Sequence, residues 1–438
     1  MKIDSGSTAW MLASTALVLL MTPGLAFFYG GMTRAKSVLN MMMMSFVSIV
    51  TVSMLWVFYG YSVAFTDNKN DFLNKFIGGF GSLGLHDLVN QATKTDGTGI
   101  PSMVFSAFQL TFAIITVALI SGAIADRAKF GSWVVFTIAW ATLVYFPVAH
   151  WVWWDGWLFK MGIEDFAGGT VVHVNAGAAG LALAFVLGKR RGWPKEPMRP
   201  HNLGYTLLGV GLLWFGWFGF NAGSELAADG TAGLAFMNTQ IATAAAAGAW
   251  ILVEKLRDGH ATTLGCASGA VAGLVAITPA CAFVDPWAAI VLGAIVGAVC
   301  AYAVGMKYKL GFDDSLDVVG VHLVGGALGA ISLGFLANYH YLDHQGQGLL
   351  YGSHSFSQLG KQALGPVAVG LYSFIMAWII GKIIDKTMGF RITEDDEVAG
   401  IDLAVHAETA YDLAPSHGGG ALAASSLAAT APKVEADA

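Results

Sequence analysis

Two histidines carry the clearest chemical signal in this sequence. His173 and His322 lie in similar frames of small and apolar residues, 171–177 and 319–325. Each frame is part of an apolar stretch long enough to cross a bilayer, where an ionisable side chain is costly and usually functional. Two imidazoles in equivalent surroundings therefore predict a conduction path. The alternative is that each histidine is a packing residue, hydrogen-bonded to a neighbouring helix.

The pair of imidazoles limits what such a path could carry. Two imidazoles in contact can share a proton, and they can both donate and accept hydrogen bonds. A path lined otherwise by apolar groups suits a small, hydrogen-bonding, largely neutral species. A metal would need further ligands, and no third histidine, cysteine or carboxylate follows at a suitable spacing on either stretch. We therefore expect neither a metal nor a cofactor.

The composition predicts that these histidines lie in a membrane. Hydrophobic residues make up 55% of the 438 residues, charged residues 12%, and the mean hydropathy is +0.62. Such values indicate an all-α polytopic membrane protein rather than a water-soluble one. The 55 glycines exceed the usual ~7% and indicate close contacts between helices. The net charge of −6 gives no reason to expect a nucleic-acid partner.

Hydropathy divides the chain into eleven stretches, each near the ~20 residues of a spanning helix. Lys and Arg concentrate in alternate loops, which predicts an external N-terminus and a cytoplasmic C-terminus. The first stretch lacks a persuasive cleavage site for a secretory signal, so it is counted as a span. The stretches are residues 7–30, 38–65, 102–125, 131–150, 168–188, 203–223, 232–254, 262–280, 286–306, 318–337 and 365–384.

The first ten stretches are expected to form two halves of five, residues 7–188 and 203–337. An odd number of spans in each half makes the halves run in opposite senses, as inverted repeats. The last stretch, 365–384, lies outside the repeat and is expected to brace it. Two glycines follow each histidine on one helix face, where another backbone can approach, so the two histidines could meet near the midplane. These glycines are Gly177, Gly180, Gly326 and Gly329.

Five segments of the chain each match a motif of one known protein family. They are residues 23–31, 165–176, 214–224, 311–314 and 317–322. The segment DFAGGTVVHVNA at 165–176 is the most specific of them. Together they resemble the ammonium transporter (Amt/Mep/Rh) family, in particular its bacterial and archaeal Amt type. The resemblance implies an eleven-helix protomer that assembles as a homotrimer, with one pore in each subunit.

The same resemblance implies an external binding site for ammonium and methylammonium, made by Phe112, Trp153 and Ser224. Aromatic faces attract a cation, and a hydroxyl oxygen accepts a hydrogen bond from it. K⁺ has a similar radius but cannot donate a hydrogen bond, so Ser224 would help to discriminate against it. The alternative for Trp153 is an aromatic residue of the membrane interface.

Phe112 and Phe220 resemble the paired rings that cover the pore entrance in this family. We expect ammonium to lose its proton near these rings and ammonia to pass His173 and His322, because a bare cation in an apolar pore is far costlier than ammonia. The favoured hypothesis for the proton is net transfer through the two imidazoles, since histidine exchanges protons near neutral pH.

Three further residues are expected to support the pore. Asp165 begins the fifth helix on the outer side, just before the stretch 168–188. There its carboxylate can accept hydrogen bonds from the free backbone N–H groups of the first turn and can supply negative potential. Asp317 opens the tenth stretch as its expected counterpart, with a structural role first. Thr278 falls where the family has a hydroxyl beside the pore, although a helix-ending Thr-Pro pair explains it equally well.

The chain is divided into a membrane domain, 1–384, a cytoplasmic segment, 385–412, and a tail, 413–438. The resemblance implies that the cytoplasmic segment regulates transport, contacts neighbouring subunits and responds to a PII-type (GlnK-like) signalling protein. A solvated acidic tail is the alternative. The tail is rich in Gly, Ala and Ser, a composition that predicts disorder.

Taken together, the sequence predicts an ammonium transporter or channel of the cell inner (plasma) membrane. An enzyme would need a nucleophile or a metal beside the histidines, and none is evident in the sequence. An ammonium sensor and an Rh-like ammonia gas channel are the alternatives. Both histidines are present, which disfavours pure sensing, and the Trp153 and Ser224 site favours the Amt type.

Overall fold

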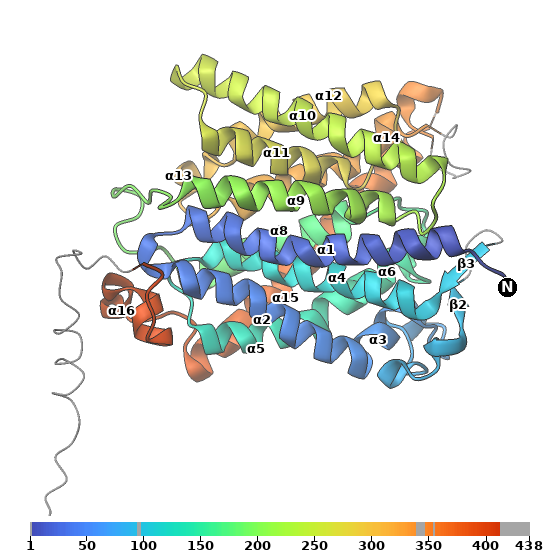
Figure 1. The fold of residues 1–438 in the computed structure, drawn as a ribbon, viewed down its shortest axis with the longest axis horizontal. Helices are drawn as coiled ribbons and strands as arrows, with labels where there is room; N and C mark the ends of the chain where they lie inside the picture. Colours follow the sequence, from blue (N-terminus) through green and yellow to red (C-terminus); the bar gives the residue numbers. More distant parts are fainter. Residues whose placement is uncertain (1, 94–97, 339–346, 354, 412–438) are drawn as a thin grey trace, which may run out of the picture.

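The computed structural model describes residues 2–93, 98–338, 347–353 and 355–411, and most of them are helical (Figure 1). The long helices run roughly parallel across one bundle. The N-terminal residues lie at one end of these helices, and the segment that follows the last long helix lies at the other end. We call these ends the N-terminal face and the C-terminal face. The predicted disordered tail, 413–438, lies outside the described residues.

The first half of the described chain contains five long helical segments. Three of them include a π-helical turn, in which the backbone accommodates one extra residue per turn. The elements are α1 (Ser5–Met32), α2 (Val38–Leu55) with the π turn Trp56–Gly60 and α3 (Tyr61–Phe65), α4 (Ser102–Ile120), α5 (Phe130–Trp140) with the π turn Ala141–Tyr145 and α6 (Phe146–Trp153), and the π turn Gly169–Val174 with α8 (Asn175–Leu187). A short helix, α7 (Trp157–Lys160), precedes the last of these segments.

The second half contains five further helical segments, one of them with a π turn, and is followed by one more long helix. Its elements are α9 (Leu203–Gly223), α10 (Gly230–Asp258), α11 (Thr263–Ile277), α12 (Pro286–Ala303) with α13 (Met306–Leu310), and the π turn Val319–Leu323 with α14 (Val324–Leu336). The last long helix is α15 (Ser357–Met388), and α16 (Glu394–Ala399) lies on the C-terminal face.

Ten helical segments in the described part of the chain are long and apolar enough to cross a membrane, which confirms a polytopic all-α membrane protein. The stretch predicted at 262–280 forms the shorter helix α11 instead. It ends at Ile277 because Pro279 has no backbone N–H to continue the helix and disfavours helical geometry in the residue before it. Conversely, α15 (Ser357–Met388) extends past the predicted stretch 365–384 at both ends, because a helix can continue into the polar residues that flank its apolar part.

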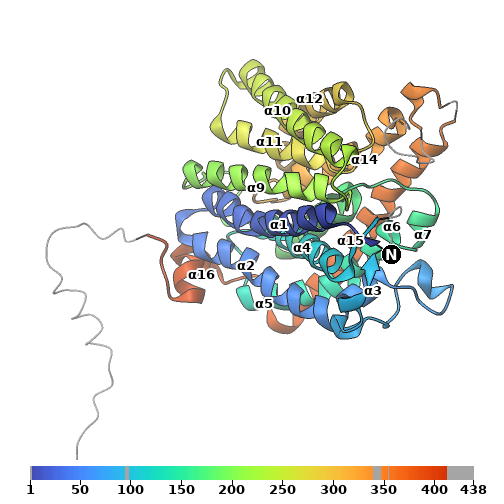
Figure 2. The same ribbon diagram turned by 45° about the vertical axis from the view of Figure 1, so that its right-hand side comes forward.

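Helices α1 and α9, the first of each half, lie side by side in Figures 1 and 2. Glycines allow their backbones to touch: a Cβ atom on Gly209 would lie 2.2 Å from the nitrogen of Phe28, and one on Gly31 would lie 2.5 Å from the nitrogen of Thr206. Such glycine contacts replace the hydrophobic driving force that is missing between helices in lipid.

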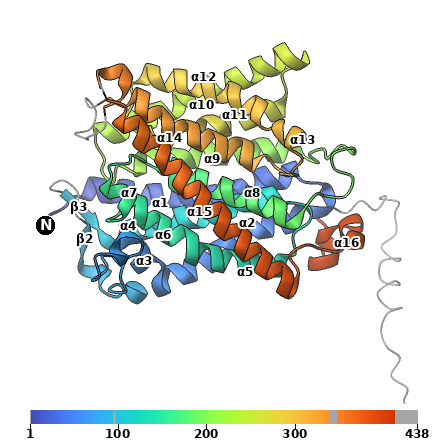
Figure 3. The same ribbon diagram turned by 180° about the vertical axis from the view of Figure 1, so that it is seen from behind.

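Helix α15 crosses the back of the bundle obliquely, over both halves (Figure 3). The fully buried amide of Gln362 donates to the carbonyl of Glu164 in the first half and to that of Ala330 in the second. Lower along the helix, the Ser373 hydroxyl donates to the carbonyl of Asn175. These bonds tie α15 to the two helices that carry the histidines.

A small three-stranded sheet lies on the N-terminal face. Strand β1 (Lys2–Ile3) pairs in parallel with β3 (Thr98–Pro101), placing Lys2 opposite Thr98. Strand β2 (Ala92–Thr93) pairs antiparallel with β3, placing Ala92 opposite Pro101. The sheet therefore ties the start of the chain to the loop between α3 and α4.

Candidate functional site

The structure brings His173 and His322 together in the interior of the bundle. Their Nδ1 atoms are 3.2 Å apart, and their ring centroids are 5.3 Å apart. The residues are only 1% and 3% exposed. Each histidine comes from one of the two related π turns, Gly169–Val174 and Val319–Leu323. Such turns are rare and occur frequently at functional sites.

Glycines allow the two histidine helices to approach at this level. A Cβ atom on Gly177 would lie 2.5 Å from the nitrogen of Leu323, and one on Gly326 would lie 2.8 Å from the carbonyl oxygen of Gly169. Any larger residue would have to displace backbone. The short distance between the imidazoles therefore depends on these two glycines.

Trp217 fixes the plane of one imidazole. Its indole stacks on His173 at a centroid distance of 5.4 Å and an interplanar angle of 22°. The indole Nε1 donates a 2.9 Å hydrogen bond to the hydroxyl of Thr278, which itself donates to the carbonyl of Leu274. Thr278 therefore has both of the roles that the sequence left open. It ends helix α11, and its hydroxyl bonds to a residue that lines the cavity.

A narrow apolar cavity of about 10 Å³, room for roughly one water-sized molecule, lies beside the two imidazoles. Phe220, Trp217 and the two histidines line it. The other lining side chains are all apolar, and they are Met21, Leu25, Phe28, Ile115, Leu119, Val172, Leu213 and Val271. Among the described residues that line the cavity, the two histidines are the hydrogen-bonding groups open to a neutral molecule, because the indole N–H of Trp217 is already bonded to Thr278.

Two stacked aromatic rings close one end of this cavity. Phe112 and Phe220 stack with their centroids 4.0 Å apart, and both are almost completely buried. Phe220 also lies 6.1 Å from the ring of His173. The ring pair therefore stands between the histidines and the space beyond Phe112.

That space is a vestibule of about 250 Å³, and strand β2 on the N-terminal face contributes Thr93 to its wall. Phe112, Trp153 and Ser224 all line it, so the three residues expected to bind the cation share one pocket. Trp153 presents an edge-on contact to Phe112 at 5.8 Å. The Ser224 hydroxyl donates to the carbonyl of Phe220, so its oxygen can still accept a hydrogen bond.

The vestibule also contains a residue that the sequence analysis did not single out. Gln109 lines the pocket, and its Oε1 atom has no hydrogen-bond partner among the described residues. The signal that could have found it is its helical spacing, because Phe105, Gln109 and Phe112 lie on one face of α4.

Asp165 supports both the vestibule and the first histidine turn. Its carboxylate accepts hydrogen bonds from the backbone nitrogens of Gly168, Thr170 and Val171, at 3.0–3.1 Å. Its backbone carbonyl accepts a 2.8 Å bond from the indole of Trp153. Burial raises the pKa of the Asp165 carboxyl to about 6, although the backbone hydrogen bonds oppose this rise.

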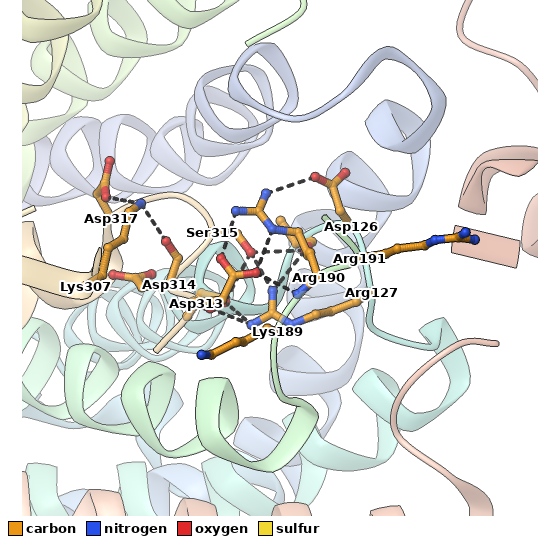
Figure 4. A network of polar contacts seen from close by, with 12 residues as sticks. Asp126, Arg127, Lys189, Arg190, Arg191, Lys307, Asp313, Asp314, Ser315 and Asp317 are labelled. Carbon is orange, nitrogen blue, oxygen red and sulfur yellow. Dashed lines mark hydrogen bonds and ion pairs between the residues drawn. The ribbon is translucent and has the colours of Figure 1, made fainter. Parts of the chain in front are cut away.

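The corresponding residue at the second histidine turn is Asp314, so the expectation that Asp317 is the counterpart of Asp165 is wrong. Asp314 accepts hydrogen bonds from the nitrogens of Val318 and Val319, at 3.1 and 2.7 Å. It precedes its histidine by eight positions, as Asp165 does. Asp317 instead forms a 2.6 Å ion pair with Lys307 (Figure 4).

A network of charged residues holds the loops on the C-terminal face together (Figure 4). Arg190 forms two 2.9 Å bonds with Asp313 and a 3.2 Å bond with Asp126. The fully buried Arg127 donates to the hydroxyl of Ser315 and to the backbone carbonyl of Asp313. Three loops that are far apart in the sequence are thereby fixed to one another.

The segment after α15 packs against this network. The buried carboxylate of Glu397 accepts hydrogen bonds from the Arg391 side chain and from the nitrogen of Arg191, both at 2.8 Å. The carboxylate of Asp402 accepts from the nitrogens of Leu39 and Asn40 at the start of α2. The segment therefore contacts the start of α2 and the loop that follows α8.

These features define the class of the protein as an all-helical, polytopic membrane protein whose vestibule, stacked rings and buried imidazoles follow one another across the bundle. The chain belongs to the Ammonium Transporter Family, because the family model matches residues 9–411. This is a family of transporters rather than enzymes, and its members are multi-pass proteins of the cell membrane.

Individual relatives agree with this assignment. The chain is 54% identical to the protein named ammonium transporter in Mycobacterium tuberculosis, over 95% of this chain and 92% of the relative. It is similar to the crystal structure of Saccharomyces cerevisiae Mep2, with a TM-score of 0.84, 34% identity, and coverage of 90% of this chain and 89% of that one. A solved structure named Sensor Amt Protein matches with a TM-score of 0.83 and 28% identity, over 91% of this chain and 98% of that one.

Proposed function

We propose that the protein transports ammonium, taking the cation up in the vestibule and passing ammonia along the two imidazoles. The observation that carries this proposal is the serial arrangement of the three parts. Phe112 lines the vestibule and stacks on Phe220, and Phe220 lines the cavity that contains His173 and His322. The names of the relatives, ammonium transporter among them, support the choice of substrate.

In this proposal, the vestibule recruits the cation. The faces of Phe112 and Trp153 attract positive charge, and the oxygen of Ser224 accepts an N–H bond. Asp165 holds Trp153 through its backbone carbonyl, and in this proposal its carboxylate adds negative potential near the site. K⁺ would lack the hydrogen bond to Ser224.

The stacked rings and the apolar cavity then favour the neutral species. Removing the water shell from an ammonium ion in an apolar cavity costs far more than removing it from ammonia, so the proton leaves near Phe112 and Phe220. Ammonia moves on past His173 and His322. The 3.2 Å distance between the imidazole nitrogens permits the proton to be relayed along the same pair, which gives net proton transfer.

The proposed topology has eleven crossings, with the N-terminus outside and the C-terminus in the cytoplasm. Its support is that the two ends of the described chain lie on opposite faces of the bundle, and that the buried arginines of Figure 4 lie on the C-terminal face. Inverted repeats at 7–188 and 203–337 agree with the side-by-side α1 and α9 and with the two related π turns. A homotrimer is proposed from the family resemblance.

Residues 385–412 form the proposed regulatory segment, through which a PII-type protein would act. Support comes from the contacts of Glu397 and Asp402, which join this segment to the loops before α2 and after α8. A partner that displaces the segment would remove both sets of hydrogen bonds. The division of the chain at residue 384 is part of this proposal, and α15 itself continues to Met388.

A sensor is the second candidate, because the structure named Sensor Amt Protein covers nearly the whole bundle. Uptake of labelled methylammonium and of ammonium into proteoliposomes separates the two. A transporter gives substrate-dependent uptake above that of protein-free vesicles, and a pure sensor binds without uptake. An Rh-like gas channel would conduct, but it would be insensitive to loss of the cation site.

The decisive variant is Trp153→Leu. Cation–π attraction contributes about 0.5–2 kcal/mol, so this change raises the KM for uptake by roughly two- to thirtyfold. Trp378→Leu, on an exposed part of α15, is the matched control and leaves the KM unchanged. The proposal is overturned if the unmodified protein gives no uptake above empty vesicles, or if both variants behave alike.

A further inference from the structure

We propose that Gln109 is a fourth member of the cation site, and that its side-chain oxygen accepts a second N–H bond from ammonium beside the bond to Ser224. This inference rests on the proposed function, because it concerns the same vestibule. The geometry that leads to it is the position of Gln109 in the pocket wall and the absence of a partner for its Oε1 atom in the described part of the chain.

Helix α4 determines which way Gln109 faces. Phe105, Gln109 and Phe112 are spaced four and then three residues apart, which places them on one helical face. All three line the vestibule. Phe112 also lies at the inner end of the vestibule, where it stacks on Phe220. The carboxamide is therefore one helical turn from the aromatic face that attracts the cation.

A partly buried carboxamide oxygen without a donor is unfavourable, because buried acceptors are normally satisfied. The Ser224 hydroxyl has its donor committed to the carbonyl of Phe220, so it can serve a ligand only as an acceptor. Gln109 can act in the same way, since its terminal amide turns about one soft torsion to present oxygen instead of nitrogen. The site would then offer two oxygen acceptors.

Two oxygens and two aromatic faces match the shape of the substrate. Ammonium directs four N–H groups toward the corners of a tetrahedron. Ser224 and Gln109 would accept two of them, and the faces of Phe112 and Trp153 would receive the others. Without Gln109, one N–H group would face no acceptor in the pocket wall once water has left.

The test compares ammonium uptake into proteoliposomes for the unmodified protein, Gln109→Leu, Gln109→Glu and Ser224→Ala. Gln109→Leu removes the acceptor and raises the KM for ammonium about fivefold or more. Gln109→Glu keeps an oxygen acceptor, so its KM stays equal to that of the unmodified protein or falls below it. Gln240→Leu is the matched control, because that glutamine is exposed on α10 and contacts Trp214 instead. Its KM is unchanged.

Two results would overturn the inference while leaving the proposed function intact. One is an unchanged KM in Gln109→Leu while Ser224→Ala raises it. The other is a KM that rises in Gln109→Glu, since the amide donors would then be what matters. If Gln109→Leu does not fold, the direction of the change in Gln109→Glu decides alone. Absence of uptake in the unmodified protein would instead defeat the proposed function.

Discussion

The indole of Trp217 donates a 2.9 Å hydrogen bond to the hydroxyl of Thr278. The same indole stacks on His173 at a centroid distance of 5.4 Å. Both residues are buried, so no bulk water replaces this bond when it is broken. The orientation of one imidazole of the pair therefore depends on a hydroxyl that does not line the cavity.

Replacing Thr278 with Val tests this dependence, because valine keeps the shape and removes the acceptor. A buried indole N–H without a partner costs about 1–3 kcal/mol, so we expect a lower thermal stability in detergent. We also expect slower transport, by roughly five- to tenfold, as Trp217 turns away from His173. Thr278→Ser keeps the hydroxyl and is expected to transport normally. Equal rates in the two variants would show that the hydrogen bond has no influence on the pore.

The corrected assignment of Asp314 makes a second prediction. Both oxygens of its carboxylate are used, one by Val318 N and one by Val319 N, so Asp314→Asn must turn an NH₂ group toward a backbone N–H. Loss of one charge-assisted bond costs about 1.5–3 kcal/mol and loosens the turn that carries His322. Thermal unfolding and uptake rates both measure the effect.

Asp317→Asn is the control for that change. Asp317 uses a single oxygen to contact Lys307, and asparagine retains an oxygen there. We expect a smaller loss of stability and near-normal uptake. If Asp317→Asn were the more damaging of the two, Asp317 rather than Asp314 would be the support of the second histidine.

The pH dependence of uptake provides a third prediction. Burial raises the pKa of Asp165 to about 6, so its carboxyl is ionised at pH 7.5, half neutral near pH 6 and mostly neutral at pH 5. Protonation occupies one acceptor oxygen and removes the negative charge of the residue that holds Trp153. Uptake should therefore fall by about threefold or more as the pH on the vestibule side drops from 7.5 to 5, although ammonium remains a cation throughout.

Asp165→Asn separates this effect from other titrations. The variant cannot ionise at this position, so its uptake should be low and should show no transition near pH 6. A transition of the same size in the variant would assign the pH dependence to another group.

The sequence allowed most of the membrane helices to be predicted, because hydropathy reports burial in lipid directly. The stretch 203–223 coincides with α9, and 168–188 differs from the observed Gly169–Leu187 by one residue at each end. The π turns were not predicted, since one extra residue in a helical turn leaves hydropathy unchanged. They nevertheless contribute both histidines.

Residues whose side chains bond to the backbone were harder to predict from the sequence than residues that line a pocket. Asp317 was the predicted counterpart because it stands directly before the apolar stretch, although the spacing of eight residues to the histidine favours Asp314. The path of the chain, with Asp317 at a φ of 64°, places the Asp314 carboxylate at the free N–H groups. Gln109 carried no motif of its own. By contrast, His173 could be proposed from its frame, and Phe112 and Ser224 from the family resemblance. The structure places His173 at the cavity and the other two at the vestibule beside it.

Ammonium-evoked current and ammonium uptake, recorded on the same proteoliposomes, test most directly whether the two imidazoles carry transport. The comparison is between the unmodified protein and the double variant His173→Ala/His322→Ala. We predict that the unmodified protein takes up ammonium together with positive charge, and that the double variant loses the current by tenfold or more. Uptake without current in the unmodified protein, or an equal current in the double variant, would contradict the proposal.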